Sequence, residues 1–310
     1  MSEINFVEYD GEKYEIYQKD TLDICGTHLE NITEIKNLDK LNNLKILHLE
    51  GNKITKIQGL ENLSNLEELD LGGNDIQKIE GLENLSNLKF LNLRGNIIPK
   101  IEGLENLTNL ECLNLTSNYA IKKLEGFDAL ANLKEFTLEH TEIKEIEALD
   151  PLTNLEGLNL SYNKITEINH LNNLKNLKRL DLSHNKIKNI KNLDYLEVLT
   201  KLALDYNQIK HIQGLQNLLN LEILCLAGNQ IKIINGLEEN TKLKDISVAD
   251  NPIKKIKNFD VLINLSRIFI HVKRLPKSVL AEFYSHFWPC MPGSYVPIKD
   301  ATKYFDSYNS

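Results

Sequence analysis

A 22-residue repeat runs through most of this 310-residue chain and constrains its fold more than any other feature. In each copy one position, here called the anchor, holds a polar residue, either Asn or Thr. Aliphatic residues occupy fixed positions before and after it. From Asn52 onward, successive anchors are 22 residues apart, except for one step of 23 between Asn118 and Thr141. With a degenerate copy at Thr27, the chain holds eleven repeats and a terminal half. The other anchors are Asn52, Asn74, Asn96, Asn118, Thr141, Asn163, Asn185, Asn207, Asn229 and Asn251.

The aliphatic positions before each anchor predict a short strand with one buried face. Leu180 and Leu182, for example, alternate with outward residues, which is the period of a half-buried strand. After the anchor, Ile and Leu recur at three-residue spacing, and this suits short extended or 3₁₀ turns. No single repeat can enclose its own apolar side chains, so neighbouring repeats must stack into one continuous core.

The anchor is the polar position in an otherwise apolar column. Buried amides need hydrogen-bond partners, so we expect the Asn side chains to lie inside the turns and bind the backbone of adjacent repeats. Thr27 and Thr141 can do this only in part. The extra residue between Asn118 and Thr141 falls within Tyr119-Ala120-Ile121, and it predicts a local irregularity.

A second recurring position predicts the corners of the turns. It holds Gly in most repeats and Asn in two of them. Because Gly and Asn are the residues that most readily adopt a positive φ, the pattern indicates a left-handed backbone there. The residues are Gly59, Gly81, Gly103, Gly126, Asn192, Gly214, Gly236 and Asn258.

The complete pattern is that of the leucine-rich repeat. Blocks such as Ile79–Leu85, and the stretch from Gly214 through Gly236 to Asn251, resemble the 22-residue repeats of the leucine-rich-repeat regulatory subunits of type-1 protein phosphatase. Similar repeats occur in bacterial adhesins of the internalin type and in cytoplasmic adaptors. The expected fold is an α/β solenoid: a right-handed superhelix with a concave parallel β-sheet and a convex side of 3₁₀ and extended turns.

The ends of the chain predict caps. Residues 4–17 alternate around Asp10-Gly11, which is the signal of a β-hairpin. Pro276 precedes apolar residues at helical spacing, and aromatic residues follow after 291–293. These aromatics either cover the last repeat or dock a partner. We therefore expect a capping hairpin at 1–21, the repeats at 22–272, and a C-terminal cap and tail at 273–310.

One outward column stands out among the positions that face away from the core. The residue just before the anchor is aromatic or His in four successive repeats, with charged residues on the same strands. Exposed aromatics beside charges favour a protein-binding surface, although a ladder that only stiffens the sheet edge stays an alternative. A smaller cluster of Ile46, Phe90 and Cys112 predicts half-buried packing. The predicted binding residues are His140, Tyr162, Arg179, Asp181, His184, Lys201, Asp205 and Tyr206.

Composition argues against several other functions. The chain has 36 Lys and Arg against 44 Asp and Glu, a net charge of −8, whereas nucleic acids and anionic membranes select basic surfaces. Four Cys residues without a C-x-x-C pair predict reduced thiols and a cytoplasmic location. Ser183 and His184 are consecutive, so their side chains should diverge on a strand and form no catalytic triad with Asp205.

We therefore expect a non-enzymatic, monomeric, cytoplasmic scaffold that holds a partner protein on its concave sheet. It should need no metal and no cofactor, and it should bind neither nucleic acid nor membrane. Two narrower or different functions stay open. The resemblance implies a regulator of a type-1-like protein phosphatase, and an extracellular adhesin of internalin type is the other alternative.

Overall fold

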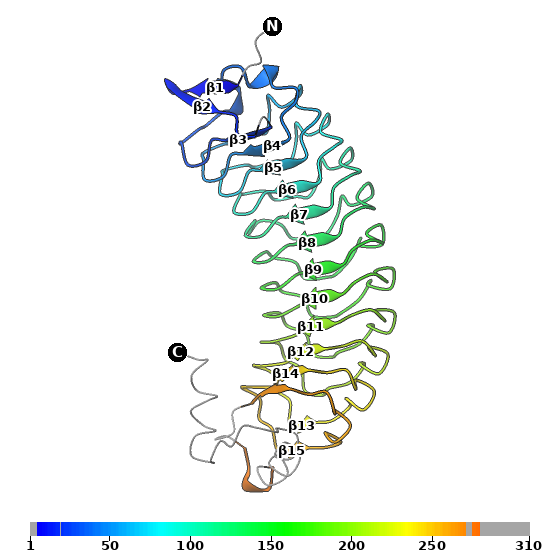
Figure 1. Ribbon diagram of the computed structural model, residues 1–310. Coiled ribbons are helices and arrows are strands. Elements are labelled where there is room, and N and C mark those ends of the chain that lie inside the picture. The colour runs from blue at the N-terminus through cyan, green and yellow to red at the C-terminus, as the bar shows by residue number, and fades with distance from the viewer. Residues whose placement is uncertain (1–4, 19, 271–274, 280–310) are drawn as a thin grey trace. The chain divides into compact units, whose positions relative to one another are not determined.

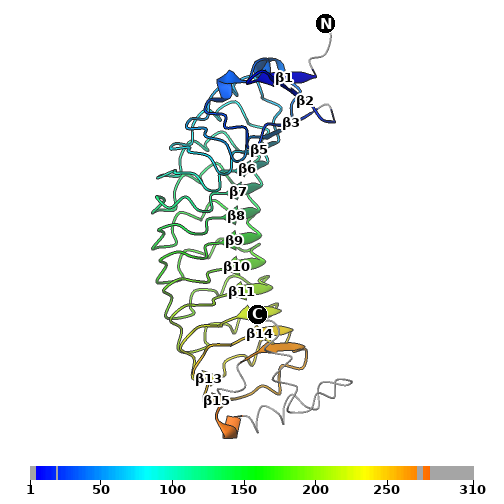
Figure 2. The same cartoon turned by 90° about the vertical axis from the view of Figure 1, so that its left-hand side faces the viewer.

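The computed structural model describes residues 5–18, 20–270 and 275–279, and the chain forms two compact units. Unit 1 comprises Met1–Ile165 and Asn169–Leu177, and unit 2 comprises Thr166–Ile168 and Lys178–Ser310. Within each unit, successive turns stack on one another, and each turn adds one short strand to a parallel sheet (Figures 1 and 2).

Parallel strands follow one another in chain order in both units. Equivalent residues of adjacent turns pair, as Leu47 does with Leu69 and Leu202 with Leu224. The expected stack of strands is therefore confirmed, turn by turn. In unit 1 the strands are β3 (Thr21–Asp23), β4 (Ile46–His48), β5 (Glu68–Asp70), β6 (Phe90–Asn92), β7 (Cys112–Asn114), β8 (Glu135–Thr137) and β9 (Gly157–Asn159). In unit 2 they are β10 (Arg179–Asp181), β11 (Lys201–Ala203), β12 (Ile223–Cys225), β14 (Asp245–Ser247) and β16 (Arg267–Phe269).

The side opposite the sheet is built from tight turns. Leu63 N donates to Leu60 O at 3.0 Å and Leu66 N to Leu63 O at 2.9 Å, which is the i to i+3 spacing of a 3₁₀ turn. Two 3₁₀ helices occur early, η1 (Ile32–Glu34) and η2 (Leu38–Lys40), and a small parallel pair, β13 (Ile233–Ile234) and β15 (Lys255–Ile256), occurs late. The predicted solenoid of 3₁₀ and extended turns is confirmed in each unit.

An antiparallel hairpin precedes the first turn of unit 1. Strands β1 (Phe6–Tyr9) and β2 (Glu12–Glu15) flank Asp10 and Gly11, whose φ angles are 50° and 79°. Positive φ at both central residues is the geometry of a type I′ turn. Bridges from Glu8 to Lys36 and from Tyr17 to Thr21 attach the hairpin to the first turns.

At the other end, a helical segment begins at Lys277 directly after Pro276, and Val279 is buried. The remaining predicted helix positions, 280–287, and the aromatic tail lie outside the described residues. The expected domain boundaries at 21/22 and 272/273 stay predictions.

The anchor asparagines connect adjacent turns through buried hydrogen bonds. In one example, Asn96 Oδ1 accepts Ile76 N at 3.0 Å, and its Nδ2 donates to Leu71 O and Leu93 O, both at 3.0 Å. Anchors 52 to 229 are buried and Asn251 is half-buried. Thr141 has no amide group, and its hydroxyl reaches only the Oδ1 of Asn163.

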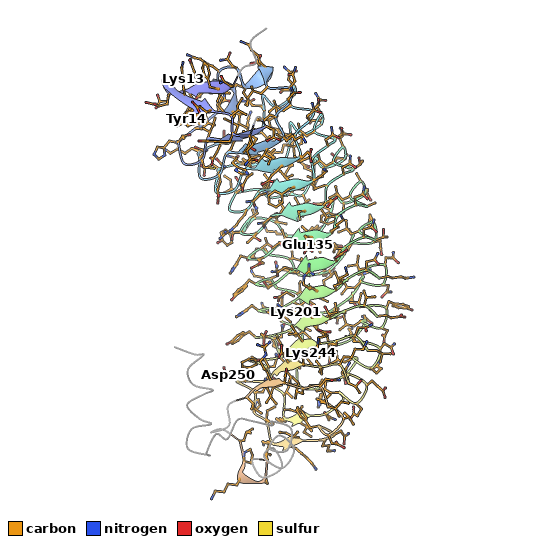
Figure 3. The ribbon with its side chains drawn as sticks, in the orientation of Figure 1. Lys13, Tyr14, Glu135, Lys201, Lys244 and Asp250 are labelled. Atoms are coloured by element: carbon orange, nitrogen blue, oxygen red, sulfur yellow. The ribbon has the colours of Figure 1, made fainter. Side chains whose placement is uncertain are left out.

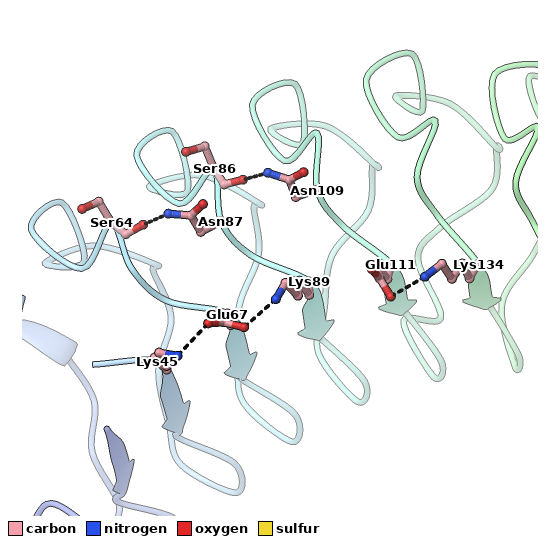
Figure 4. Close-up of polar contacts among 9 residues, drawn as sticks. All are labelled: Lys45, Ser64, Glu67, Ser86, Asn87, Lys89, Asn109, Glu111 and Lys134. Carbon is pink, nitrogen blue, oxygen red and sulfur yellow. Dashed lines mark hydrogen bonds and ion pairs between the residues drawn. The ribbon is translucent and has the colours of Figure 1, made fainter. Parts of the chain in front are cut away.

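A second asparagine column was not anticipated from the sequence. It lies nine residues before the anchor, on the exposed turns, and each Nδ2 donates to a backbone carbonyl of the preceding turn. Asn87 bonds Ser64 O and Asn109 bonds Ser86 O, each at 2.9 Å (Figure 4). Because these bonds are exposed to water, they add less stability than the buried anchors.

A column of alternating charge lies just before the strands. In unit 1 it reads Lys, Glu, Lys, Glu, Lys, Glu in six successive turns, from residue 45 to residue 156. Glu67 contacts Lys45 at 3.2 Å and Lys89 at 2.6 Å, and Glu111 contacts Lys134 at 2.8 Å (Figure 4). Hydrogen bonds from the two lysines hold the pKa of the Glu67 carboxyl below its usual value.

The irregular turn between Asn118 and Thr141 is filled by aromatic side chains. Phe127 and Phe136 occupy positions that hold Leu in the neighbouring turns. Their ring centroids lie 5.2 Å apart with an interplanar angle of 63°, an edge-to-face contact that is favourable for buried rings. Two buried Phe side chains thus replace two Leu side chains of a regular turn.

The corner glycines adopt positive φ as predicted, from 69° at Gly214 to 78° at Gly59 and Gly126. Asn192 and Asn258 do the same, at 60° and 54°. Ala148 (55°) and His170 (54°) occupy the same corner in two other turns, and the Gly and Asn pattern had not revealed them. A side chain there is strained, because the left-handed region costs an L-residue about 1–2 kcal/mol.

We expect Asn96→Ala to lower the free energy of unfolding by about 2 kcal/mol, because it leaves the buried Ile76 N–H without its acceptor. Asn87→Ala removes one exposed bond and should cost less than about 0.5 kcal/mol. Urea denaturation of both variants measures the difference. Equal losses would show that the two columns contribute alike.

We expect corner substitutions to change stability in opposite directions. A Cβ on Gly103 would lie 2.2 Å from Ile79 O, so Gly103→Ala should lower the melting temperature, at a cost of about 2 kcal/mol or more. Ala148→Gly relieves strain at a cost in chain entropy and should gain about 0.5 kcal/mol. Thermal melts test the pair, and a shift of the same sign in both contradicts the corner argument.

Candidate protein-binding surface

The outward side of each sheet, here called the strand face, is formed by residues that alternate with the buried leucines. On β8, for example, Glu135 and Thr137 are half-buried on either side of the fully buried Phe136. Not every outward position is open, since Ala203 is only 4% exposed and Ser161 only 3%. The accessible side chains of the face therefore gather at the beginnings and the ends of the strands.

Just before the anchor, the chain turns sharply through a left-handed residue. Glycine occupies this position in several turns, such as Gly73 with φ 60° and Gly95 with φ 65°. In four successive turns the same conformation is held by a ring-bearing residue. These are His140 (φ 52°), Tyr162 (φ 55°), His184 (φ 54°) and Tyr206 (φ 52°). The left-handed conformation of each of these residues costs about 1–2 kcal/mol relative to an unstrained residue. The rings are therefore held in place by a strained backbone.

The rings stack in pairs within each unit. In unit 1 the centroids of His140 and Tyr162 lie 4.1 Å apart at 18°, and in unit 2 those of His184 and Tyr206 lie 4.4 Å apart at 20°. Tyr162 is 43% and Tyr206 50% exposed. The Tyr206 ring also lies over Gly228, where a Cβ would come within 2.4 Å of Cδ1. Each unit thus presents one ordered, half-exposed aromatic pair at the edge of its sheet.

The charged residues predicted around the rings of unit 2 occupy both ends of its strands. Arg179 and Lys201 are exposed where β10 and β11 begin. Asp181 Oδ1 accepts Ser183 N at 2.9 Å, and Asp205 Oδ1 accepts Ala227 N at 2.7 Å. Burial raises the pKa of the Asp205 carboxyl, and the nearby Asp181 adds to the shift.

Unit 1 carries a more acidic strand face, with its own polar contacts. Asp70 Oδ1 accepts Gly72 N at 2.8 Å and Asn92 Nδ2 at 3.0 Å. Beside the ring pair, Asn159 Nδ2 donates to Glu139 Oε1 at 2.6 Å. Ile46, Phe90 and Cys112 are half-buried, as the sequence predicted.

Two exposed apolar side chains of unit 1 were missed from the sequence. Ile97 is 51% and Tyr119 67% exposed, and both directly follow an anchor. The signal was present, because the same position holds a charged residue in neighbouring repeats, such as Asp75 and Glu142. They enlarge the apolar area that unit 1 presents beyond the ends of its strands.

The residues considered for a catalytic triad, Ser183, His184 and Asp205, are not arranged for catalysis. Ser183 is only 8% exposed, and a backbone N–H already occupies one oxygen of Asp205. In the part of the chain that the structure describes, no group of three or more His, Cys, Asp or Glu side chains is placed to hold a metal ion. The same residues include no helix with the length and hydrophobicity that crossing a bilayer requires.

Comparison with known proteins gives matches to repeat families and to solved structures. The family described as Leucine Rich repeats (2 copies) matches residues 64–106, 86–129, 131–173 and 153–195, and the one described as Leucine Rich Repeat matches residues 43–63. No curated protein matches the sequence.

Three solved structures share the architecture. An internalin from Listeria monocytogenes is 28% identical with a TM-score of 0.65 over 84% of each chain. A leucine-rich-repeat protein of Leptospira interrogans is 25% identical with a TM-score of 0.72, over 82% of this chain and 73% of the other. TLR13, in its complex with ssRNA13, is 26% identical with a TM-score of 0.72, over 81% of this chain but only 39% of its own.

The family matches fall on the turns in which the buried anchors and the short parallel strands recur. The solved relatives are alike over four fifths of the chain, well beyond the stretch that the family matches cover. Repeat pattern, hydrogen-bond geometry and structural likeness therefore agree that this chain is a leucine-rich repeat protein.

Proposed function

We propose that this protein is a non-enzymatic scaffold that binds a partner protein, and that the stacked His–Tyr pair of each unit contacts the partner. Leucine-rich repeats present a large preformed surface, so little chain ordering is lost on binding. The observation that carries the proposal is the pair of aromatic stacks held by strained backbone. Strain of this kind concentrates at functional sites, and exposed Tyr is typical of interface hot spots.

The surroundings of the rings support binding more than simple stiffening of the sheet edge. A glycine such as Gly73 closes the same corner without a ring, so the turn itself does not need one. The half-exposed tyrosines also leave apolar area in contact with water, which a partner would cover. Regulation of a type-1-like phosphatase is a narrower prediction that has no support among the matches.

The likeness to an internalin favours one second candidate, an extracellular adhesin. The two candidates differ in location, and the expected cytoplasmic location stays a prediction from composition. Antibody labelling of intact cells, compared with the soluble fraction of broken cells, separates them. Labelling of the intact surface supports the adhesin, and recovery in the soluble fraction alone supports the scaffold.

We expect the double variant Tyr162→Ala/Tyr206→Ala to keep its fold and to capture its partner at least about tenfold less, because truncating hot-spot tyrosines costs about 2 kcal/mol or more. The measurement is affinity capture from extracts of the source cells, with quantitative mass spectrometry.

The matched control is Tyr17→Ala/Tyr195→Ala. It removes two tyrosines that are 60% and 56% exposed, one in each unit, and neither occupies the position just before an anchor. Unchanged capture by the control with loss in the test variant supports the site. Equal capture by both variants would mean that the ring pairs bind nothing.

A further inference from the structure

A strip of basic residues follows the anchors of unit 2. It comprises the four segments that lie between an anchor and its corner, residues 186–191, 208–213, 230–235 and 252–257. These segments hold eight Lys and one His but no Asp or Glu, although the net charge of the whole chain is −8. Lysine occupies the third residue after the anchor in four successive turns, and this column is called the lysine ladder. Its members, all of them exposed, are Lys188, Lys210, Lys232 and Lys254.

Backbone hydrogen bonds place the members of the lysine ladder directly beside one another. Gln230 N donates to Ile209 O at 2.8 Å, and Lys254 N donates to Lys232 O at 2.7 Å. At the spacing of neighbouring strands, about 4.8 Å per turn, the four ladder positions span about 14 Å. Like charges on adjacent strands repel one another, so the ladder is unfavourable unless a bound counter-charge neutralises it.

In unit 1, most of the corresponding segments carry carboxylates beside their lysines. Lys100, for example, pairs with Glu102 at 2.9 Å, six residues after the anchor. Lys191 of the strip is bound by Glu167 at 2.9 Å, but among the described residues no member of the ladder takes part in an ion pair. The unpaired ladder is therefore a property of unit 2 and not of the repeat. In unit 2 the position of Glu102 is occupied by Lys191, Gln213, Asn235 and Lys257.

The surroundings of the ladder favour a narrow, extended polyanion. Acidic residues border the strip on both sides: Asp194, Glu238 and Asp260 follow the corners, and Asp250 lies at the edge that follows β14 (Figure 3). A nucleic acid duplex or an anionic bilayer spreads its charge over a wide surface and would meet these carboxylates as well. The strip contains no Phe, Tyr or Trp, whereas single-stranded nucleic acids are bound largely by stacking on aromatic rings.

We propose that the lysine ladder binds an extended acidic segment of a partner protein, which runs along the stack across the four turns. An extended chain advances about 3.3 Å per residue, so about five residues cover the ladder. Asp or Glu at every second position faces the lysines, whose flexible four-carbon stems absorb the difference in spacing. This site goes beyond the ring contacts proposed above and does not depend on them.

Fluorescence polarisation of the purified full chain tests the proposal with a labelled eight-residue peptide of alternating Glu and Ser. Saturable binding is expected at low ionic strength, and added salt should weaken it because exposed charges are screened. Lys210→Glu/Lys232→Glu should reduce the affinity at least tenfold, since both lysines lie in the middle of the ladder. Absence of saturable binding, or an unchanged affinity in this variant, overturns the proposal.

The matched control is Lys53→Glu/Lys56→Glu in unit 1. It makes the same change of net charge at two exposed lysines that also follow an anchor, and it should leave the affinity unchanged. Equal losses in the two variants would show that the peptide responds only to net charge, which contradicts the ladder. Thermal melts verify folding, and the ladder variant should melt no lower than the unaltered chain because it relieves repulsion between like charges.

Two other polyanions, tested on the unaltered chain, distinguish the class of ligand. An oligothymidine with the same number of negative charges as the peptide, and vesicles of anionic phospholipid, are compared with it at one salt concentration. Preference for the peptide supports the proposal. Tighter binding of the oligothymidine or the vesicles overturns the assignment to an acidic protein segment, and this comparison requires no variant.

Failure of this inference is distinguishable from failure of the scaffold function. Tyr162→Ala/Tyr206→Ala should bind the acidic peptide as the unaltered chain does. If that variant loses partner capture while the peptide fails to bind the unaltered chain, the ring contacts stand and the ladder assignment is wrong. If the peptide binds through the ladder while capture is unaffected by the tyrosines, the ladder stands and the ring contacts are wrong.

Discussion

The hydrogen bonds of the buried anchor asparagines are the interaction on which the rest of the structure depends. A turn of 22 residues contains too little regular structure to satisfy its own backbone, and its strand has only three residues. One Asn side chain supplies an acceptor and two donors to neighbouring backbone groups, as Asn96 does. The backbone of each turn is thereby hydrogen-bonded to a side chain of its neighbour, so the stability of one turn depends on the turns beside it.

The same tight turn explains how the ring pairs come to lie at the edge of each sheet. A chain that leaves a strand and immediately buries an anchor must pass through a left-handed residue, and glycine does so at the lowest cost. A His or Tyr at this position lowers the local stability of the turn, because its backbone is strained, but it holds an aromatic ring in a fixed direction. Stacking within each pair returns part of the cost, since paired rings gain roughly 0.5–1.5 kcal/mol beyond their burial.

The repeats, the buried anchors and the glycine corners were predictable because each is a column read across many turns. The exposed asparagine column and the charge column recur as regularly, but their residues are common on any surface, so pattern alone did not set them apart. The strain at Ala148 and His170 was not predictable, because neither residue signals a positive φ. The burial of Ala203 and Ser161 was not predictable either, because it depends on the side chains of adjacent turns.

The alternating lysines and glutamates of unit 1 have a consequence for the length of the protein. Equivalent charges recur every second turn, so the electrostatic period of the stack is twice its structural period. Deleting or duplicating a single turn would set two like charges side by side, whereas changing the stack by two turns preserves the alternation. The ion-pair column of this unit therefore tolerates the gain or loss of two adjacent turns better than that of one.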